Sequence, residues 1–454
     1  MEGGFHEGGF TPLRPLGHAE KYSTTRSSLA IYLNVGLTAL YKRPDGVPVK
    51  PALLHALSTL ISKHPILSAI PVATDTPNPY FVRLPKIILN EVVTFIKHDV
   101  TSPSSDWSET LDKVLEEEHN HPFEVKPNTT LPFWRFCVLE SSNCPESFGL
   151  VFMFHHSLMD TKSALSLHDE LEGYMAQYSG PVPSDTVYSP SLDLIPSLED
   201  LYGLPVSQKF LQSQESYTEP SPDSWTGAVQ FRPVKTRFAS LWLSEVETKG
   251  LIARSKKERT SVTAALQALI ATCIFSVLPS TYNTLQGDCA VSLRQFLPEP
   301  VTASTLGCYV GSTSTTYHRK SSFDWGEARR TKVDIENAMA QKGSDMSVGY
   351  LAFIPNQHQW MLQKLGRKRM SAFELSNIGS SFSSREASKF QCEGMLFSQS
   401  SSACSGAMKV SAVTGRDGKL ALGFTWQQGA VEADMVEGIK RALKGEIERL
   451  AVSA

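Results

Sequence analysis

A short run of apolar residues is the feature that most restricts what this chain can fold into. Residues 149–154 read GLVFMF and are apolar at odd and even positions alike. Because successive strand residues face opposite sides of a sheet, such a strand must lie in the middle of a sheet covered on both faces. The residues that follow are apolar or aromatic at helical spacing: Ala164, Leu167, His168, Leu171, Met175 and Tyr178. The sequence therefore predicts a central strand, a turn and an amphipathic helix.

The length and the distribution of proline indicate two lobes. One hydrophobic core stops growing at about 250–300 residues, and this chain has 454. Eight of its 27 prolines lie between residues 181 and 233, beside a polar run without periodicity, as expected of a crossover. We expect an N-terminal lobe at residues 1–214, which ends in this proline-rich crossover, and a C-terminal lobe at 215–454.

Both halves carry a mixture of helix and strand patterns, which predicts the fold class α/β with two similar mixed lobes. Helices are expected at residues 51–63, 261–278 and 431–450, and strands at 133–139, 149–154, 289–293, 407–414 and 420–426. The last two strands flank GRDGK, whose Asp-Gly pair is a hairpin turn signal.

Composition excludes several classes of protein. With 43 Lys and Arg against 46 Asp and Glu, the net charge is -3, which does not favour a nucleic-acid partner. Seven cysteines form no CxxC pair, so neither a zinc ribbon nor a disulfide framework is expected. The N-terminus shows no signal-peptide pattern, and the most apolar long stretch, 264–278, is shorter than a membrane span. We expect a cytoplasmic protein without a transmembrane segment.

The turn after the central strand carries the residues best suited to chemistry. It reads HHSLMD, so that His155 and His156 end the strand and Asp160 begins the helix. Only one of two adjacent strand residues can face a given cleft. The residues alone leave three interpretations open: a structural histidine pair with a helix-capping aspartate, a metal site, or a general base with a pKa near neutrality. Because adjacent histidines diverge and no further ligand stands out, we predict no metal site.

Another run of ionisable residues, EEEHNH at 116–121, is more typical of a solvent-exposed helix end than of a metal or nuclease site. The sequence contains no GxSxG elbow, Walker loop or dinucleotide fingerprint in the expected context. Serine hydrolases, nucleotide hydrolases and dinucleotide enzymes are therefore disfavoured.

The spacing of His155, His156 and Asp160 matches the HHxxxD motif of the coenzyme A-dependent acyltransferases, which include chloramphenicol acetyltransferase, condensation domains and plant enzymes. Several further segments resemble the fungal alcohol acetyltransferase branch: LRPLGHAEKY at 13–22, LISKHPIL at 60–67, LPFWRFCVLE at 131–140, VSLRQFLP at 291–298, LGCYVG at 306–311 and ELSNIG at 374–379. The DFGWG motif of the plant branch is missing, and FDWG at 323–326 does not reproduce its order. The chain thus resembles the fungal branch over most of its length.

This resemblance implies a chloramphenicol acetyltransferase-like fold with a tunnel between the lobes, and it implies roles for individual residues. His155 would be the general base, and His156 would be structural. Asp160 would be architectural and would pair with Arg294. Ser376 and Asn377 would line the cleft and steady an oxyanion, although an ordinary turn at a strand end explains these two residues equally well.

The resemblance also implies an acyl-CoA-dependent alcohol O-acyltransferase that uses acetyl-CoA as co-substrate, holds no bound cofactor and acts as a monomer. Its acceptor would be a small alcohol or a hydroxylated secondary metabolite. Three alternatives stay open: a repurposed member that performs condensation or cyclisation, an N-acyltransferase, and a non-catalytic small-molecule-binding protein.

Overall fold

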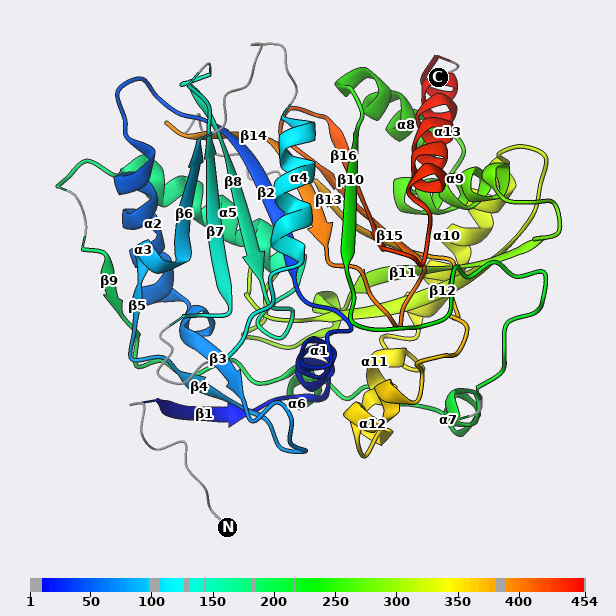
Figure 1. Cartoon of the computed structure of the whole chain (residues 1–454), viewed down its shortest axis with the longest axis horizontal. Coiled ribbons are helices and arrows are strands. Elements are labelled where there is room, and N and C mark those ends of the chain that lie inside the picture. The colour runs from blue at the N-terminus through cyan, green and yellow to red at the C-terminus, as the bar shows by residue number, and fades with distance from the viewer. Residues whose placement is uncertain are drawn as a thin grey trace.

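The computed structural model describes residues 10–97, 107–125, 131–142, 144–181, 184–215, 217–380 and 389–452. Two large mixed sheets stand side by side, each with helices packed on it, and form two lobes (Figure 1). This arrangement confirms the predicted α/β class with two similar lobes.

The first lobe is built on a five-stranded sheet in the order β14, β2, β8, β7, β6. Its strands span Gln391–Gln399 (β14), Val35–Lys42 (β2), Ser147–Phe154 (β8), Trp134–Glu140 (β7) and Val93–Lys97 (β6). β8 lies in the middle, antiparallel to β2 and β7, and its residues from Phe148 onward are all buried. The run that is apolar on both faces is therefore the central strand, as predicted.

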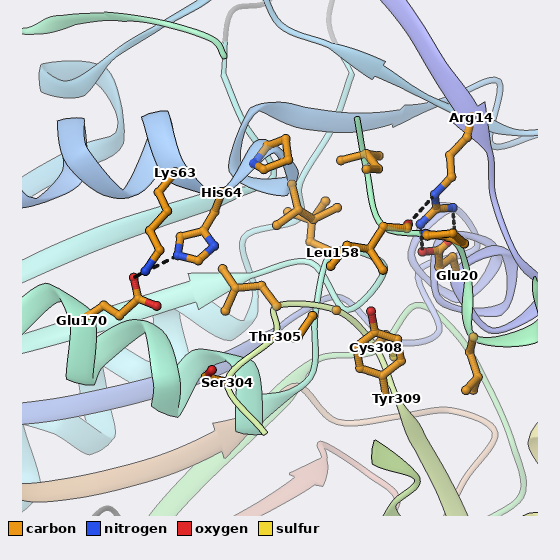
Figure 2. Close-up of a pocket in the computed structure, with 18 residues that line it drawn as sticks. Arg14, Glu20, Lys63, His64, Leu158, Glu170, Ser304, Thr305, Cys308 and Tyr309 are labelled. Atoms are coloured by element: carbon orange, nitrogen blue, oxygen red, sulfur yellow. Dashed lines mark hydrogen bonds and ion pairs between the residues drawn. The ribbon is translucent and has the colours of Figure 1, made fainter. Parts of the chain in front are cut away.

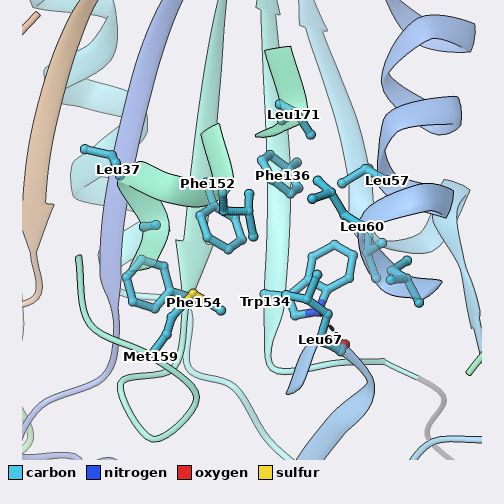
Figure 3. Packing of buried hydrophobic residues seen from close by; sticks show 14 of the residues in the cluster. Leu37, Leu57, Leu60, Leu67, Trp134, Phe136, Phe152, Phe154, Met159 and Leu171 are labelled. Atoms are coloured by element: carbon cyan, nitrogen blue, oxygen red, sulfur yellow. Dashed lines mark hydrogen bonds between the residues drawn. The ribbon is translucent and has the colours of Figure 1, made fainter. Parts of the chain in front are cut away.

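The two faces of β8 pack against different layers. Even-numbered side chains such as Phe152 and Phe154 join the core beneath α2 (Val49–Lys63) and α5 (Thr161–Gln177), where Trp134 also donates its Nε1 hydrogen to the Leu67 carbonyl at 2.7 Å (Figure 3). Odd-numbered side chains such as Met153 face α4 (Ser108–His119) and the second lobe. Thus the strand that ends in the HHxxxD motif is held from both sides.

The second lobe contains a six-stranded sheet in the order β10, β16, β15, β13, β11, β12. Its strands span Thr236–Trp242 (β10), Leu420–Gln427 (β16), Met408–Thr414 (β15), Phe373–Ser380 (β13), Thr284–Ser292 (β11) and Val310–His318 (β12). One face is apolar and packs against helices that include α9 (Val262–Val277) and α13 (Ala433–Val452). The opposite face carries a row of polar cross-strand neighbours: Asp288, Glu374, Lys409 and Thr425.

The remaining elements connect and cover the two sheets. The short strands are β1 (Thr11–Pro15), β3 (Ala69–Val72), β4 (Tyr80–Arg83), β5 (Lys86–Ile88) and β9 (Thr186–Tyr188). The other helices are α1 (His18–Ser28), α3 (Leu89–Val92), α6 (Leu198–Leu201), α7 (Gln208–Glu215), α8 (Glu245–Lys257), α10 (Trp325–Ala340), α11 (Ser347–Tyr350) and α12 (Gln357–Leu362), with 3₁₀ turns η1 (Pro65–Ser68), η2 (Arg294–Phe296) and η3 (Leu351–Phe353). In Figure 1, α1 lies low in the centre, between the lobes.

One strand crosses between the lobes. β14 follows β13 in sequence, yet it pairs with β2 at the edge of the first sheet and also contacts β15 and β16 of the second. The expected division into residues 1–214 and 215–454 therefore stays a prediction. β14 belongs to the second half of the sequence but lies in the first sheet. An open tunnel between the lobes also stays a prediction.

Within the described residues, no single helix has the length and hydropathy to cross a bilayer. α8 and α9 reach that threshold only as a pair, and their axes bend by 104°. Most of α9 is buried inside the second lobe.

Candidate active site

The HHxxxD loop is fixed by the elements on both sides of it. The backbone N–H of His155 donates to the carbonyl of Phe133, the residue before β7, at 2.9 Å. The hydrogen-bond ladder between β7 and β8 therefore extends one residue past the end of β8. At the other end, Asp160 caps α5 by accepting from the Ser163 backbone N–H at 3.0 Å. This confirms the predicted helix-entry position of Asp160.

His155 is enclosed in the first lobe. Its side chain packs between Phe123 and Phe133, and the residue is only 2% exposed. Its Nδ1 accepts a hydrogen bond from the Ser157 backbone N–H at 3.1 Å and lies 2.7 Å from the Ser157 hydroxyl. Burial, followed by the charges of His156 and Arg26, lowers the pKa of His155 to about 3. The ring is therefore a neutral group within the packing of the first lobe.

His156 lies on the other side of the backbone and is only partly buried. Its ring is 6.1 Å from the Tyr32 ring, and its Nδ1 lies 3.6 Å from the Cys308 sulfur. The Cys308 contact is the one hydrogen bond that this ring makes to another residue within the described part of the chain. No described group bonds Nε2. Burial and then the charge of Arg26 lower the pKa of His156 to about 4.

The surroundings of the two histidines contradict the orientation that we predicted for them. The more accessible ring belongs to His156, which the resemblance makes structural, and the packed ring to His155, which it makes the general base. The alternation of β8, whose even-numbered residues fill the core under α2 and α5, ends at Phe154, so the turn after the strand and not the strand itself orients the two rings.

Asp160 and Arg294 form the ion pair that the resemblance implies. Arg294 donates from Nη1 to Oδ2 at 2.6 Å and from Nη2 to Oδ1 at 2.9 Å, and both side chains are buried. The backbone N–H of Tyr309 also donates to Oδ2 at 3.0 Å. Burial alone would raise the pKa of Asp160, but the Arg294 charge and these hydrogen bonds hold it below its usual value. The carboxylate is fully occupied, which supports an architectural role.

This pair also binds the segment that contacts His156. Arg294 donates to the Thr305 and Gly307 carbonyls, and the backbone N–H of Asp160 donates to the Gly307 carbonyl at 3.1 Å. The next residue is Cys308, whose sulfur lies against His156. Residues 304–309 are thus tied to the motif loop and define one side of the His156 environment.

Ser376 and Asn377, expected to line the cleft, face different ways on β13. The Asn377 amide donates to the Thr263 hydroxyl of α9 at 3.0 Å, and its oxygen accepts from the Gly379 backbone N–H at 2.9 Å. Asn377 therefore binds to the helix layer, and the expectation that it lines the cleft is wrong. Ser376 lies on the opposite face, where it pairs in register with Ser411 of β15.

A cavity of about 310 Å³ adjoins the motif loop (Figure 2). Its middle is mainly apolar, with Leu158 of the loop in its wall, and each end carries an ion pair: Lys63 with Glu170, and Arg14 with Glu20. Its lining comprises Arg14, Glu20, Lys63, His64, Pro65, Ile66, Leu158, Glu170, Leu194, Ile195, Pro196, Leu198, Ser304, Thr305, Leu306, Gly307, Cys308 and Tyr309. Its volume is typical of small-molecule sites.

The run at 116–121 ends α4 as expected, with Glu117 and His121 exposed, but one of its residues is buried. His119 is completely buried, and its Nδ1 lies 2.6 Å from the Asn34 side-chain oxygen. Glu118 pairs with Arg135 at 2.5 Å. Across the described ranges, no group of three or more His, Cys, Asp or Glu side chains is placed to hold a metal ion.

The sequence analysis missed a group of polar residues beside His156. Tyr32 lies near the His156 ring and near the Lys409 ammonium group, which is 5.1 Å from the Tyr32 centroid. Lys409 pairs with Glu374 at 2.8 Å, and Arg26 stacks on Tyr32. These residues come from α1, the segment after it, β13 and β15, and no sequence motif joins them. Only the resemblance of the segments around Tyr22 and Glu374 pointed to these regions.

Comparisons with known proteins give the family of the chain. The family model for alcohol acetyltransferase matches residues 15–437. The "Probable alcohol acetyltransferase crmB" of Aspergillus fumigatus is 31% identical over 456 residues, which cover 94% of this chain and 97% of that protein. The "Probable alcohol acetyltransferase FCK4" of Fusarium pseudograminearum is 22% identical, with 98% and 96% covered.

Solved structures show the same fold at low identity. The TRI3 trichothecene 15-O-acetyltransferase from Fusarium sporotrichioides superposes with a TM-score of 0.69 at 12% identity, covering 96% of this chain and 94% of that chain. An epimerization domain of tyrocidine synthetase B superposes with a TM-score of 0.62 at 13% identity, covering 98% of both chains. Given its two-lobed fold, its HHxxxD loop and a family match over nearly its whole length, the chain belongs to the alcohol acetyltransferase family and is an acetyltransferase.

Proposed function

We propose that this acetyltransferase moves the acetyl group of acetyl-CoA to the hydroxyl of a small alcohol or a hydroxylated secondary metabolite, with His156 as general base. The observation that carries the proposal is the partly accessible ring of His156, whose Nε2 is bonded by none of the residues that the structure describes. The family match and the names of the relatives support the acetyl group and the alcohol.

A general base needs a lone pair on the nitrogen that faces its substrate. Nδ1 of His156 lies 3.6 Å from the Cys308 sulfur, and no described group bonds its Nε2, which can therefore carry the lone pair. His155 has the opposite arrangement, because its Nδ1 accepts from the Ser157 N–H and its proton therefore resides on Nε2. Of the two rings, that of His156 suits proton abstraction by its exposure and by an Nε2 that no described group bonds.

The proposed reaction has two steps and forms no acyl-enzyme. In the first, the acceptor hydroxyl gives its proton to Nε2 of His156 while its oxygen attacks the thioester carbonyl carbon. The carbonyl electrons move to oxygen and leave a tetrahedral oxyanion. In the second, the oxyanion collapses, the carbon–sulfur bond breaks, and the departing sulfur takes the proton from the imidazolium. The products are the acetyl ester and free coenzyme A.

A direct test supplies acetyl-CoA with matched alcohols and amines of the same carbon skeleton. We expect acetyl-CoA-dependent release of free thiol, and esters identified by mass, with the alcohols. Acetylation of the amines alone would replace this proposal with N-acylation. If no acceptor reacts, thermal unfolding with CoA separates two explanations, because a ligand at 100 times its dissociation constant stabilises by about 2.7 kcal/mol. Absence of that shift would indicate a non-catalytic binder.

A further inference from the structure

Arg26 is a buried cation in the last turn of α1. The residue is 8% exposed, and its guanidinium lies between two aromatic rings, with Cζ 4.1 Å from the Tyr22 centroid and 4.4 Å from the Tyr32 centroid. Its Nε is buried and has no hydrogen-bond partner among the residues that the structure describes. Cation–π contact holds the group in place, but it does not neutralise the charge.

The other buried charges around His156 are paired with each other. Asp160 binds Arg294, and Glu374 binds Lys409 at 2.8 Å. Within the described part of the chain, no carboxylate forms an ion pair with Arg26. A buried charge is unfavourable unless it is compensated. The site thus carries an uncompensated positive charge, which is expected where negative charge must be held during a reaction.

Tyr32 connects this cation to the motif. Its ring stacks on Arg26 and lies 6.1 Å from the His156 ring. The charge of Arg26 also acts on groups beyond Tyr32. It contributes to the lowered pKa of both His156 and Glu374. A guanidinium is a hydrogen-bond donor and no acceptor, so Arg26 is not a candidate for the base.

We propose that Arg26 is an electrostatic positioning residue of the transferase site, whose uncompensated charge favours the neutral form of His156 and the oxyanion at the thioester carbon. This inference rests on the proposed function. The same charge disfavours the imidazolium that forms in the first step, and it therefore promotes return of the proton to the departing sulfur.

Other groups act on His156 as well. From its own loop these are His155 and Asp160, from the 304–309 segment Cys308, from α1 and its continuation Arg26 and Tyr32, and from the second sheet Glu374 and Lys409. Asp288 lies beyond the Glu374–Lys409 pair, bonds the Ser314 and Ser371 hydroxyls and has its pKa raised to about 6 by burial. Arg26 is distinguished among these groups as the charge with no ion-pair partner.

The test compares the pH dependence of kcat/KM in three proteins: wild type, Arg26→Met, which keeps volume without charge, and Arg26→Lys, which keeps the charge. We expect the acidic limb of the kcat/KM profile to lie about one to two pH units higher in Arg26→Met than in the wild type. Its kcat on the plateau should fall by about ten- to a hundredfold, while Arg26→Lys should keep the wild-type limb. Arg329→Met is the matched control, because Arg329 is 47% exposed and pairs with Glu258 on the surface.

This inference is overturned if a folded Arg26→Met variant keeps the acidic limb of the wild-type kcat/KM profile. If His156→Ala is inactive in the same comparison, the proposed function stays intact. Full activity of His156→Ala would instead overturn the proposed base. If Arg26→Met does not fold, Arg26→Gln takes its place. The wild-type limb is an independent check: it should lie well below pH 6, and a limb at the ordinary histidine pKa of about 6.5 would contradict the role of Arg26.

Discussion

Asp160 and Arg294 hold each other through two hydrogen bonds of 2.6 and 2.9 Å, although 134 residues separate them in the sequence. One residue caps the helix that follows the motif loop, and the other begins the turn that follows β11. The pair therefore joins the lobes directly beside His156.

Asp160→Asn should lower both stability and activity, because it leaves a buried guanidinium with a neutral partner. Removing one member of a truly buried pair costs about 3–5 kcal/mol. Arg294→Met in the same protein should restore part of the melting temperature, since the stranded charge is then absent. Melting curves and kcat of the single and double variants measure this.

Two other results would assign Asp160 a different role. Loss of kcat without a change in melting would mean that the aspartate orients an imidazole, as in a triad. Almost no change in either quantity would mean that it only caps α5, because asparagine and aspartate cap about equally well.

Acidification should destabilise the protein below about pH 6.5, the ordinary histidine pKa. Burial lowers the pKa of His119 and His155 to about 3 and that of His168 to about 4. The unfolded chain binds protons at these residues while the folded chain does not. The free energy of unfolding is thus unaffected by protonation of these histidines above pH 6.5. It falls as the pH drops toward the folded pKa values, by about 1–2 kcal/mol per histidine at pH 5.

Urea unfolding at pH 7 and pH 5 measures this loss. His168→Gln removes one of the three groups and should make the difference between the two pH values smaller. An unchanged free energy of unfolding at pH 5 would show that these histidines are protonated in the folded state as well.

Cys308 should not become acetylated, although its sulfur lies 3.6 Å from Nδ1 of His156. Burial, followed by the nearby Asp160, raises the thiol pKa well above its ordinary value, which disfavours the nucleophilic thiolate. We expect intersecting double-reciprocal plots, since both substrates must be bound together. Incubation with acetyl-CoA alone should leave the protein mass unchanged, and Cys308→Ala should keep most of the activity. Parallel plots, or a trapped acetyl group that disappears in Cys308→Ala, would indicate a ping-pong mechanism.

Patterns local in sequence predicted much of the fold. The run that is apolar on both faces forms β8, and the residues with helical spacing after it form α5. The Asp-Gly turn joins β15 to β16, with Gly418 at a φ of 72° that an L-residue rarely adopts. The partnership of Asp160 and Arg294 came from the resemblance, because no periodicity connects residues so far apart.

What could not be predicted depends on packing between distant segments. The orientation of His155 and His156 depends on the turn that begins after Phe154, at the end of β8. Arg26 lies in a helix whose sequence, HAEKYSTTRSS, is mostly polar, and nothing in that pattern predicts that Arg26 is buried against Tyr22 and Tyr32. The placement of β14 in the first sheet is likewise a long-range pairing.

The most direct test of the account compares kcat/KM and melting temperature for His156→Ala and His155→Ala, with acetyl-CoA and an accepted alcohol. His156→Ala should lower turnover by about 10²- to 10⁴-fold, the usual effect of losing a positioned general base, with little change in melting. His155→Ala should lower the melting temperature, because it leaves a gap between Phe123 and Phe133, and should retain more activity than His156→Ala. If His156→Ala keeps more than about a third of wild-type kcat/KM, far above the range expected for a lost base, while His155→Ala is inactive and folded, then His155 is the base and the account is wrong.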